Sequence, residues 1–211
     1  MFCGEGACAD TGGVGFQHTD HMFCKGNVDL LLKIRLSMVV SQAFSENDES
    51  LTEGIIQGLK DIGALPLIPV TNFMCRKLVR HCMNCGIIPV LLLPGGLDGF
   101  LLDADNPYAD ILCDVMEADG LLVTVNPPGV KQSKPVVIKT LLHVAGFSPN
   151  VITYYTLSEG QSDTMFESAI ANKMQVFVPD NLVSSGTCLS QNPVSVSVIA
   201  SDLYPKHVLP L

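Results

Sequence analysis

The sequence has no apolar stretch long enough to cross a membrane. Its longest apolar run, residues 87–93, contains Pro89 and is far shorter than the roughly 20 residues that a spanning helix requires. The chain also has no Asn-x-Ser/Thr sequon, and its first residues have neither the basic start nor the apolar middle of a signal peptide. We therefore expect a cytoplasmic protein with no membrane span.

Positive charge is scarce. Lysine and arginine total 12 against 21 acidic residues, which gives a net charge of −9 and a pI near 4.8. A chain of this charge repels phosphate backbones, so nucleic acid is not expected as a partner. Only 16% of residues are charged and the mean hydropathy is +0.36, which favours apolar surface covered in a homo- or hetero-oligomer.

Cysteine is too rare for a disulfide scaffold, because there are 8 cysteines in 211 residues. This frequency predicts free thiols in a reducing compartment. Five potential zinc ligands do gather near the start of the chain: Cys3, Cys8, His18, His21 and Cys24. Their spacing matches no standard finger, so an incidental Cys/His-rich segment is the alternative. Cys82 and Cys85 are expected to be packing thiols, because they fall at the end of a predicted helix rather than at its start.

Short apolar segments alternate with helical patterns along most of the chain, which predicts an α/β fold. Strands are expected at residues 64–70, 87–93, 121–125, 174–178 and 194–200, and helices at 30–44, 51–62, 72–84, 106–117 and 163–173. At 30–44 the pattern alone does not separate strand from helix, and a helix is favoured. Residues 135–142 look extended at first and then helical, and residues 151–156 are left unassigned. We expect a three-layer sandwich with a mostly parallel sheet, formed by one domain over residues 28–211, after an irregular Gly/Cys/His-rich segment at 1–27.

Ligands of parallel sheets bind beyond the carboxyl ends of the strands, so residues 70–72, 94–96 and 125–134 are the first candidates. Gly95 and Gly96 fit either a phosphate-binding turn or a plain tight turn. Asp98, Asp103 and Asp105 fit either a Mg²⁺ site or a solvated loop. Neither a Walker-type phosphate loop nor a Gly-x-Ser-x-Gly motif is present, so a hydrolase is not indicated.

The order of these motifs resembles the amino-acid kinase superfamily over about residues 51–200. The segments are Gly-Ile-Ile-Pro-Val at 86–90, Pro-Gly-Gly at 94–96, Asp-Ala-Asp-Asn at 103–106, Glu-Ala-Asp-Gly-Leu-Leu-Val-Thr at 117–124, Glu-Ser-Ala at 167–169, the strand at 174–178 with Pro-Asp-Asn-Leu after it, and Gly-Thr at 186–187. This is the family of glutamate kinase, UMP kinase and the molybdenum storage proteins, and the last two are the most similar.

The resemblance implies a site for ATP and Mg²⁺. It assigns Gly95 and Gly96 to phosphate, Asp105 to the orientation of substrate or Mg²⁺, and a final group to the rest of the nucleotide: Thr124, Asn126, Gly129 and Lys131. The family's first strand, with its lysine and glycine pair, has no counterpart before Leu30. Pro128 and Lys134 stand where the family has acidic residues. We therefore expect a nucleotide-binding protein with weak or absent phosphoryl transfer.

Two alternatives remain open. The first is a non-catalytic, oligomer-forming subunit, either structural or storing a molybdate or tungstate oxoanion as the storage proteins do. The second is an active ATP-dependent kinase of UMP or a small acid. In that kinase the transferred phosphate would have to be bound by a cation at an unexpected position, such as Lys25, Lys33 or Arg35.

Overall fold

The computed structural model describes residues 22–40, 46–102, 105–148, 150–153, 175–179 and 196–199, and these residues contain one eight-stranded sheet. The strands are β1 (Phe23–Gly26), β2 (Ile34–Val39), β3 (Leu65–Pro69), β4 (Val90–Leu92), β5 (Leu121–Thr124), β6 (Asn150–Thr153), β7 (Gln175–Pro179) and β8 (Val196–Ile199). Their order across the sheet is β1-β5-β4-β3-β2-β6-β7-β8. β1 runs antiparallel to β5, and the other neighbouring pairs are parallel.

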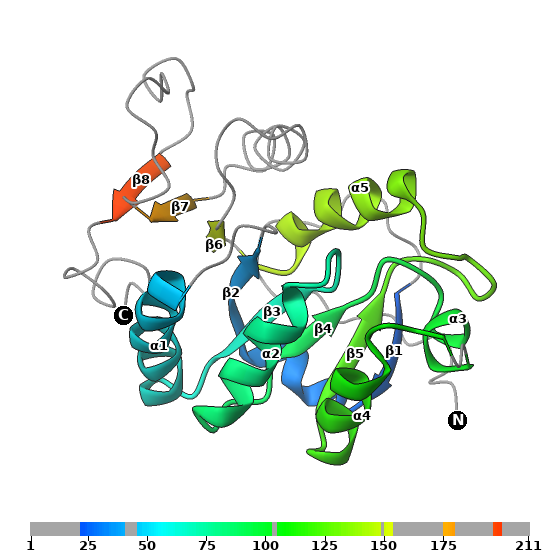
Figure 1. The fold of residues 1–211 in the computed structure, drawn as a ribbon, viewed down its shortest axis with the longest axis horizontal. Coiled ribbons are helices and arrows are strands. Elements are labelled where there is room, and N and C mark those ends of the chain that lie inside the picture. Colours follow the sequence, from blue (N-terminus) through cyan, green and yellow to red (C-terminus); the bar gives the residue numbers. More distant parts are fainter. Residues whose placement is uncertain are drawn as a thin grey trace.

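Helices cover both faces of this sheet (Figure 1). They are η1 (Val28–Lys33), α1 (Glu46–Asp61), α2 (Cys75–Asn84), α3 (Leu97–Leu102), α4 (Ala109–Glu117), α5 (Lys134–His143) and η2 (Val144–Gly146). From β2 to β5 the chain steps outward one strand at a time, and right-handed crossovers then place α1, α2 and α4 on the same face. From β5 the chain returns through α5 to β6 on the other side of β2, so α5 packs on the opposite face with η1.

The central strands are buried on both faces, which explains their continuous apolar sequences. In β4, Leu91 packs under α1, α2 and α4, whereas its neighbours Val90 and Leu92 pack on the side of α5. β5 alternates in the same way, with Leu122 on the first side and Leu121 on the second. The structure therefore confirms the predicted α/β class with a mostly parallel sheet.

Most expected elements are present with shifted ends, and a glycine follows each of two helices. Gly63 follows α1 with φ +65° and Gly86 follows α2 with φ +81°, a left-handed conformation in which a side chain is strained. Residues 135–142, which look extended at first and then helical in sequence, form α5, and residues 151–156 contain most of β6. The helix expected at 163–173 lies outside the described residues.

The helix favoured for residues 30–44 is wrong over its described part, residues 30–40. Residues 28–33 form the short 3₁₀ helix η1, and Ile34–Val39 is β2. In the sheet, β3 to β5 lie on one side of β2 and β6 to β8 on the other. The apolar residues of a central parallel strand are continuous rather than alternating, so their pattern does not separate them from a buried helix. Leu30 and Leu31 at the start favoured the helix, whereas Ile34 and Val39 belong to the strand.

Two further elements were not expected. Phe23–Gly26, inside the segment predicted to be irregular, pairs with β5 as the edge strand β1. Leu97–Leu102 forms α3, directly after the Gly95–Gly96 turn. The division of the chain near residue 27 and the single domain after it stay predictions. Each helix in the described ranges is too short or too polar to cross a lipid bilayer.

Candidate functional site

The loops after β4 and β5 meet at the carboxyl edge of the sheet, where the sequence placed a ligand. The hydroxyl of Thr124, at the end of β5, donates hydrogen bonds to the carbonyl oxygens of Leu93 and Gly95 at 3.1 and 2.7 Å. The N–H of Gly96 donates to the carbonyl oxygen of Val130 at 2.8 Å. A Cβ on Gly96 would lie 2.6 Å from the carbonyl oxygen of Pro127. The two loops are therefore in direct backbone contact.

Asp98, at the start of α3, completes this contact between the loops. Both of its carboxylate oxygens accept from the N–H of Gly129, at 2.9 and 2.8 Å. This hydrogen bond outweighs the opposing effect of burial and lowers the pKa of Asp98 below its usual value. The N–H groups of Gly96 and Gly129 thus form hydrogen bonds within the protein.

The other predicted site residues are only partly brought together. Asn126 lies beside Thr124, is 2% exposed, and its side-chain nitrogen has no hydrogen-bond partner among the described residues. Lys131 is exposed in the same loop, and Asp105 is exposed in the turn before α4. The assignments of Asp105 and Lys131 to substrate and nucleotide stay predictions.

Of the five predicted zinc ligands, only Cys24 lies within the described residues. Cys24 is in β1, half-buried, and the ligands Cys3, Cys8, His18 and His21 fall outside. The described part of the chain contains no cluster of three potential metal ligands. Its five cysteines are all free, in agreement with the predicted thiols. The pKa of Cys82 is raised by burial and by the neighbouring Cys85 thiol, as expected for packing thiols.

We expect the Asp98→Asn variant to be less stable than the wild type at neutral pH. The change removes the negative charge of the carboxylate that accepts the hydrogen bonds from the N–H of Gly129. The folded-state pKa of Asp98 is lowered, so its contribution is present above the unfolded-state pKa and is lost as the pH falls through the folded-state value. The difference in melting temperature between the two proteins should therefore shrink below about pH 4. Thermal unfolding as a function of pH measures it, and a difference that is constant down to low pH would contradict the assignment.

A second surface, on the outer face of α2, combines positive charge with an aromatic ring. Residues from this helix and the turn before it line an open hollow of about 420 Å³, and we call them the α2 patch: Phe73, Met74, Arg76, Lys77, Arg80, His81 and Asn84. Three of them are cations within five residues, and α2 contains no acidic residue. The helical spacing of three and four residues places the cations on one face. Their buried neighbours Leu78, Val79 and Cys82 hold the other face of α2 on the core.

The ring of Phe73 is available to a partner on this surface. Phe73 is 61% exposed, which is unusual for a large aromatic side chain. The guanidinium carbon of Arg76 lies 4.9 Å from the centre of the ring, within the range of a cation–π contact. The ring and its charged neighbour therefore form one exposed unit at the start of α2.

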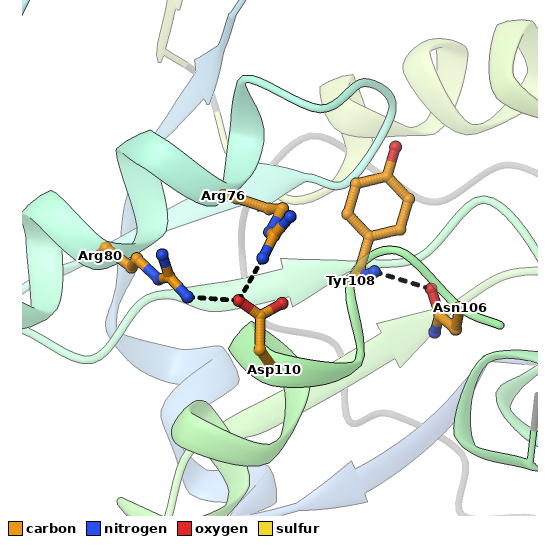
Figure 2. Close-up of polar contacts among 5 residues, drawn as sticks. All are labelled: Arg76, Arg80, Asn106, Tyr108 and Asp110. Carbon is orange, nitrogen blue, oxygen red and sulfur yellow. Dashed lines mark hydrogen bonds and ion pairs between the residues drawn. The ribbon is translucent and has the colours of Figure 1, made fainter. Parts of the chain in front are cut away.

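Asp110, in the first turn of α4, contacts both arginines of the α2 patch (Figure 2). One of its oxygens, Oδ2, accepts from the Nη2 of Arg76 at 2.6 Å and from the Nη2 of Arg80. Burial opposes ionisation of this carboxyl, but the hydrogen bonds and the two positive charges outweigh it and lower its pKa. Asp110 therefore carries its negative charge in the middle of a cationic surface.

The α2 patch was missed because the sequence was assessed by its total charge. A net charge of −9 describes the average over the chain, whereas a ligand meets the charges within about 10 Å of it. The signal was present in the helix expected at 72–84, where Phe73, Arg76 and Arg80 follow one another at helical spacing. Helical projection of each predicted helix would have found it.

Comparisons with known proteins find structural relatives only. No family model matches the chain, and no curated protein matches it in sequence. DNA processing protein A from Helicobacter pylori, described with a unique single-stranded DNA binding mode, superposes with a TM-score of 0.66 at 14% identity, over 85% of this chain and 80% of that one. DNA processing protein A from Streptococcus pneumoniae gives 0.64 at 21% identity over 86% of this chain, which spans only 64% of that protein.

These likenesses overturn the resemblance to the amino-acid kinase superfamily. Apolar strands followed by glycine turns, with an aspartate before the next helix, occur wherever parallel strands alternate with helices, so their order does not separate one α/β family from another. The expected functions of nucleotide binding, oxoanion storage and small-molecule phosphorylation rested on that resemblance and are corrected with it. The expectations of ATP, Mg²⁺, zinc and oligomer formation are not tested by any of these findings.

The exclusion of nucleic acid is also corrected. It rested on net charge alone, and a structural neighbour of this chain is a single-stranded DNA-binding protein. At these identities the likeness establishes the fold alone.

Proposed function

We propose that this chain binds single-stranded DNA along the α2 patch. The observation that carries the proposal is the exposed ring of Phe73 beside Arg76, at the start of a helix whose outer face has three cations and no acidic residue. Proteins that bind single strands combine aromatic side chains, on which bases stack, with cations that contact the phosphates. The likeness to the single-stranded DNA-binding protein of Helicobacter pylori supports the same class of ligand.

The arrangement favours a single strand over a duplex. The bases of a duplex are stacked on one another inside the helix, so an aromatic side chain on a protein surface gains a stacking partner only from an unpaired base. The residues from Phe73 to Asn84 extend along about three turns of helix, or roughly 16 Å. This length accommodates only a few nucleotides, and the excess of acidic residues in the chain as a whole disfavours binding outside the patch.

Fluorescence anisotropy with a labelled oligothymidine of about 20 nucleotides tests the proposal. We expect binding at low salt that weakens with a slope of between about −1 and −2 in a plot of log K against log salt. Each cation that contacts a phosphate displaces about 0.7 counterion from a single strand, and the charge of Asp110 offsets one of the three cations. A duplex of the same length should bind more weakly. No binding of the single strand at the lowest salt would refute the proposal.

Charge reversal at Lys77 provides the matched comparison. We expect Lys77→Glu to weaken binding of the oligothymidine by roughly tenfold and to flatten the salt dependence. Lys139→Glu makes the same change in net charge on α5, on the opposite face of the sheet, and should leave the affinity within about twofold of the wild type. Equal losses in the two variants would mean that overall charge, and not the α2 patch, governs binding.

A further inference from the structure

Asp110 holds both arginines of the α2 patch through a single oxygen atom. Arg76 and Arg80 lie one helical turn apart on α2, and each donates through Nη2 to Oδ2 of Asp110 (Figure 2). The side chains are 26%, 54% and 32% exposed for Arg76, Arg80 and Asp110, so the cluster faces solvent. A phosphate that reaches the patch meets these guanidinium groups with a carboxylate already bound to them.

The cluster contributes little as a link between helices. Ion pairs at this exposure stabilise a protein by about 1 kcal/mol or less, and α2 and α4 already share the buried core that contains Leu78, Ile111 and Val115. Its effect on an anionic ligand is larger, because one negative charge among three cations removes about a third of the local positive charge.

The guanidinium groups keep donors for a second anion. An arginine has five N–H donors, and the contacts with Asp110 use the Nη2 group of each. The Nε of Arg76 is buried and has no hydrogen-bond partner among the described residues, so the donors that face an anion are the outer N–H groups of the two guanidinium groups. An anion with several oxygens can therefore take over the contacts of Asp110 and add others.

We infer that Asp110 is an internal competitor of the bound strand, occupying the guanidinium groups of Arg76 and Arg80 that the phosphates would otherwise contact. This inference rests on the proposed function and identifies the residue that limits the affinity of the site. Removal of the carboxylate charge then strengthens binding, whereas removal of a residue that only positions the arginines would weaken it.

The experiment compares Asp110→Asn with the wild type on two probes, the oligothymidine and inorganic pyrophosphate. We expect Asp110→Asn to bind the oligothymidine roughly fivefold more tightly and to steepen its salt slope by about 0.7. Asp29→Asn makes the same change in charge on η1, on the opposite face of the sheet, and should change neither value. In a background of Arg76→Gln and Arg80→Gln, Asp110→Asn should give no gain, because the groups for which it competes are absent.

Each outcome decides a separate point. If the wild type binds the oligothymidine and Asp110→Asn binds it equally or more weakly, the inference is overturned and the proposed function stands. If neither protein binds the oligothymidine but Asp110→Asn binds pyrophosphate more tightly than the wild type, the competition is supported and the proposed function is refuted. If Asp110→Asn binds neither the oligothymidine nor pyrophosphate more tightly than the wild type, and its melting temperature matches that of the wild type, the competition is absent.

Discussion

Leu91→Ala and Leu92→Ala should each lower the free energy of unfolding by about 2–5 kcal/mol, the usual cost of a buried leucine truncated to alanine. The two residues are neighbours in β4 and both are fully buried, but they point to opposite faces of the sheet. Each truncation leaves a cavity in a different layer of the core. Urea unfolding followed by circular dichroism measures both losses.

The pair tests whether both faces of the sheet are covered. Leu142→Ala on α5, where the side chain is 41% exposed, serves as the control and should cost less than about 1 kcal/mol. In a sheet with one face in solvent, one of the two β4 variants would resemble this control. A large loss for Leu91→Ala and a small one for Leu92→Ala would contradict the three-layer fold.

Elements with local signals could be predicted from the sequence. α1 and α2 have apolar residues on one face and a glycine at the end, and β3 and β5 are short apolar segments beside turns. Elements that depend on distant partners were missed. β1 is a strand only because Phe23–Gly26 pairs with residues nearly 100 positions later, and no local pattern encodes that pairing.

The α2 patch is not among the predicted site residues for a related reason. Glycines and aspartates at the ends of strands attract attention because they serve phosphate sites in many proteins, but here Gly96, Asp98 and Gly129 bond with one another or with a neighbouring loop. Their partners are known only when the loops are placed in space. The exposure of Phe73 and the contact of Asp110 with α2, 30 or more residues away in sequence, likewise depend on tertiary structure.

Phe73→Ala should weaken binding of the oligothymidine by roughly 5- to 150-fold, because stacking of a base on an aromatic ring contributes about 1–3 kcal/mol. The loss arises from the ring and not from charge, so the salt slope should stay at the wild-type value while the affinity falls at every salt concentration. This separates Phe73 from Lys77, whose reversal flattens the slope. Anisotropy across a salt series measures both quantities in one experiment.

Two further variants determine whether the ring acts by stacking. Phe73→Trp keeps an aromatic face over which Arg76 can lie and should retain most of the affinity, whereas Phe73→Leu keeps an apolar side chain without that face and should bind nearly as weakly as Phe73→Ala. Because Phe73 is mostly exposed, none of the three changes should alter the free energy of unfolding by more than about 0.5 kcal/mol. If Phe73→Leu binds as tightly as the wild type, the contact with the strand is apolar and not stacking.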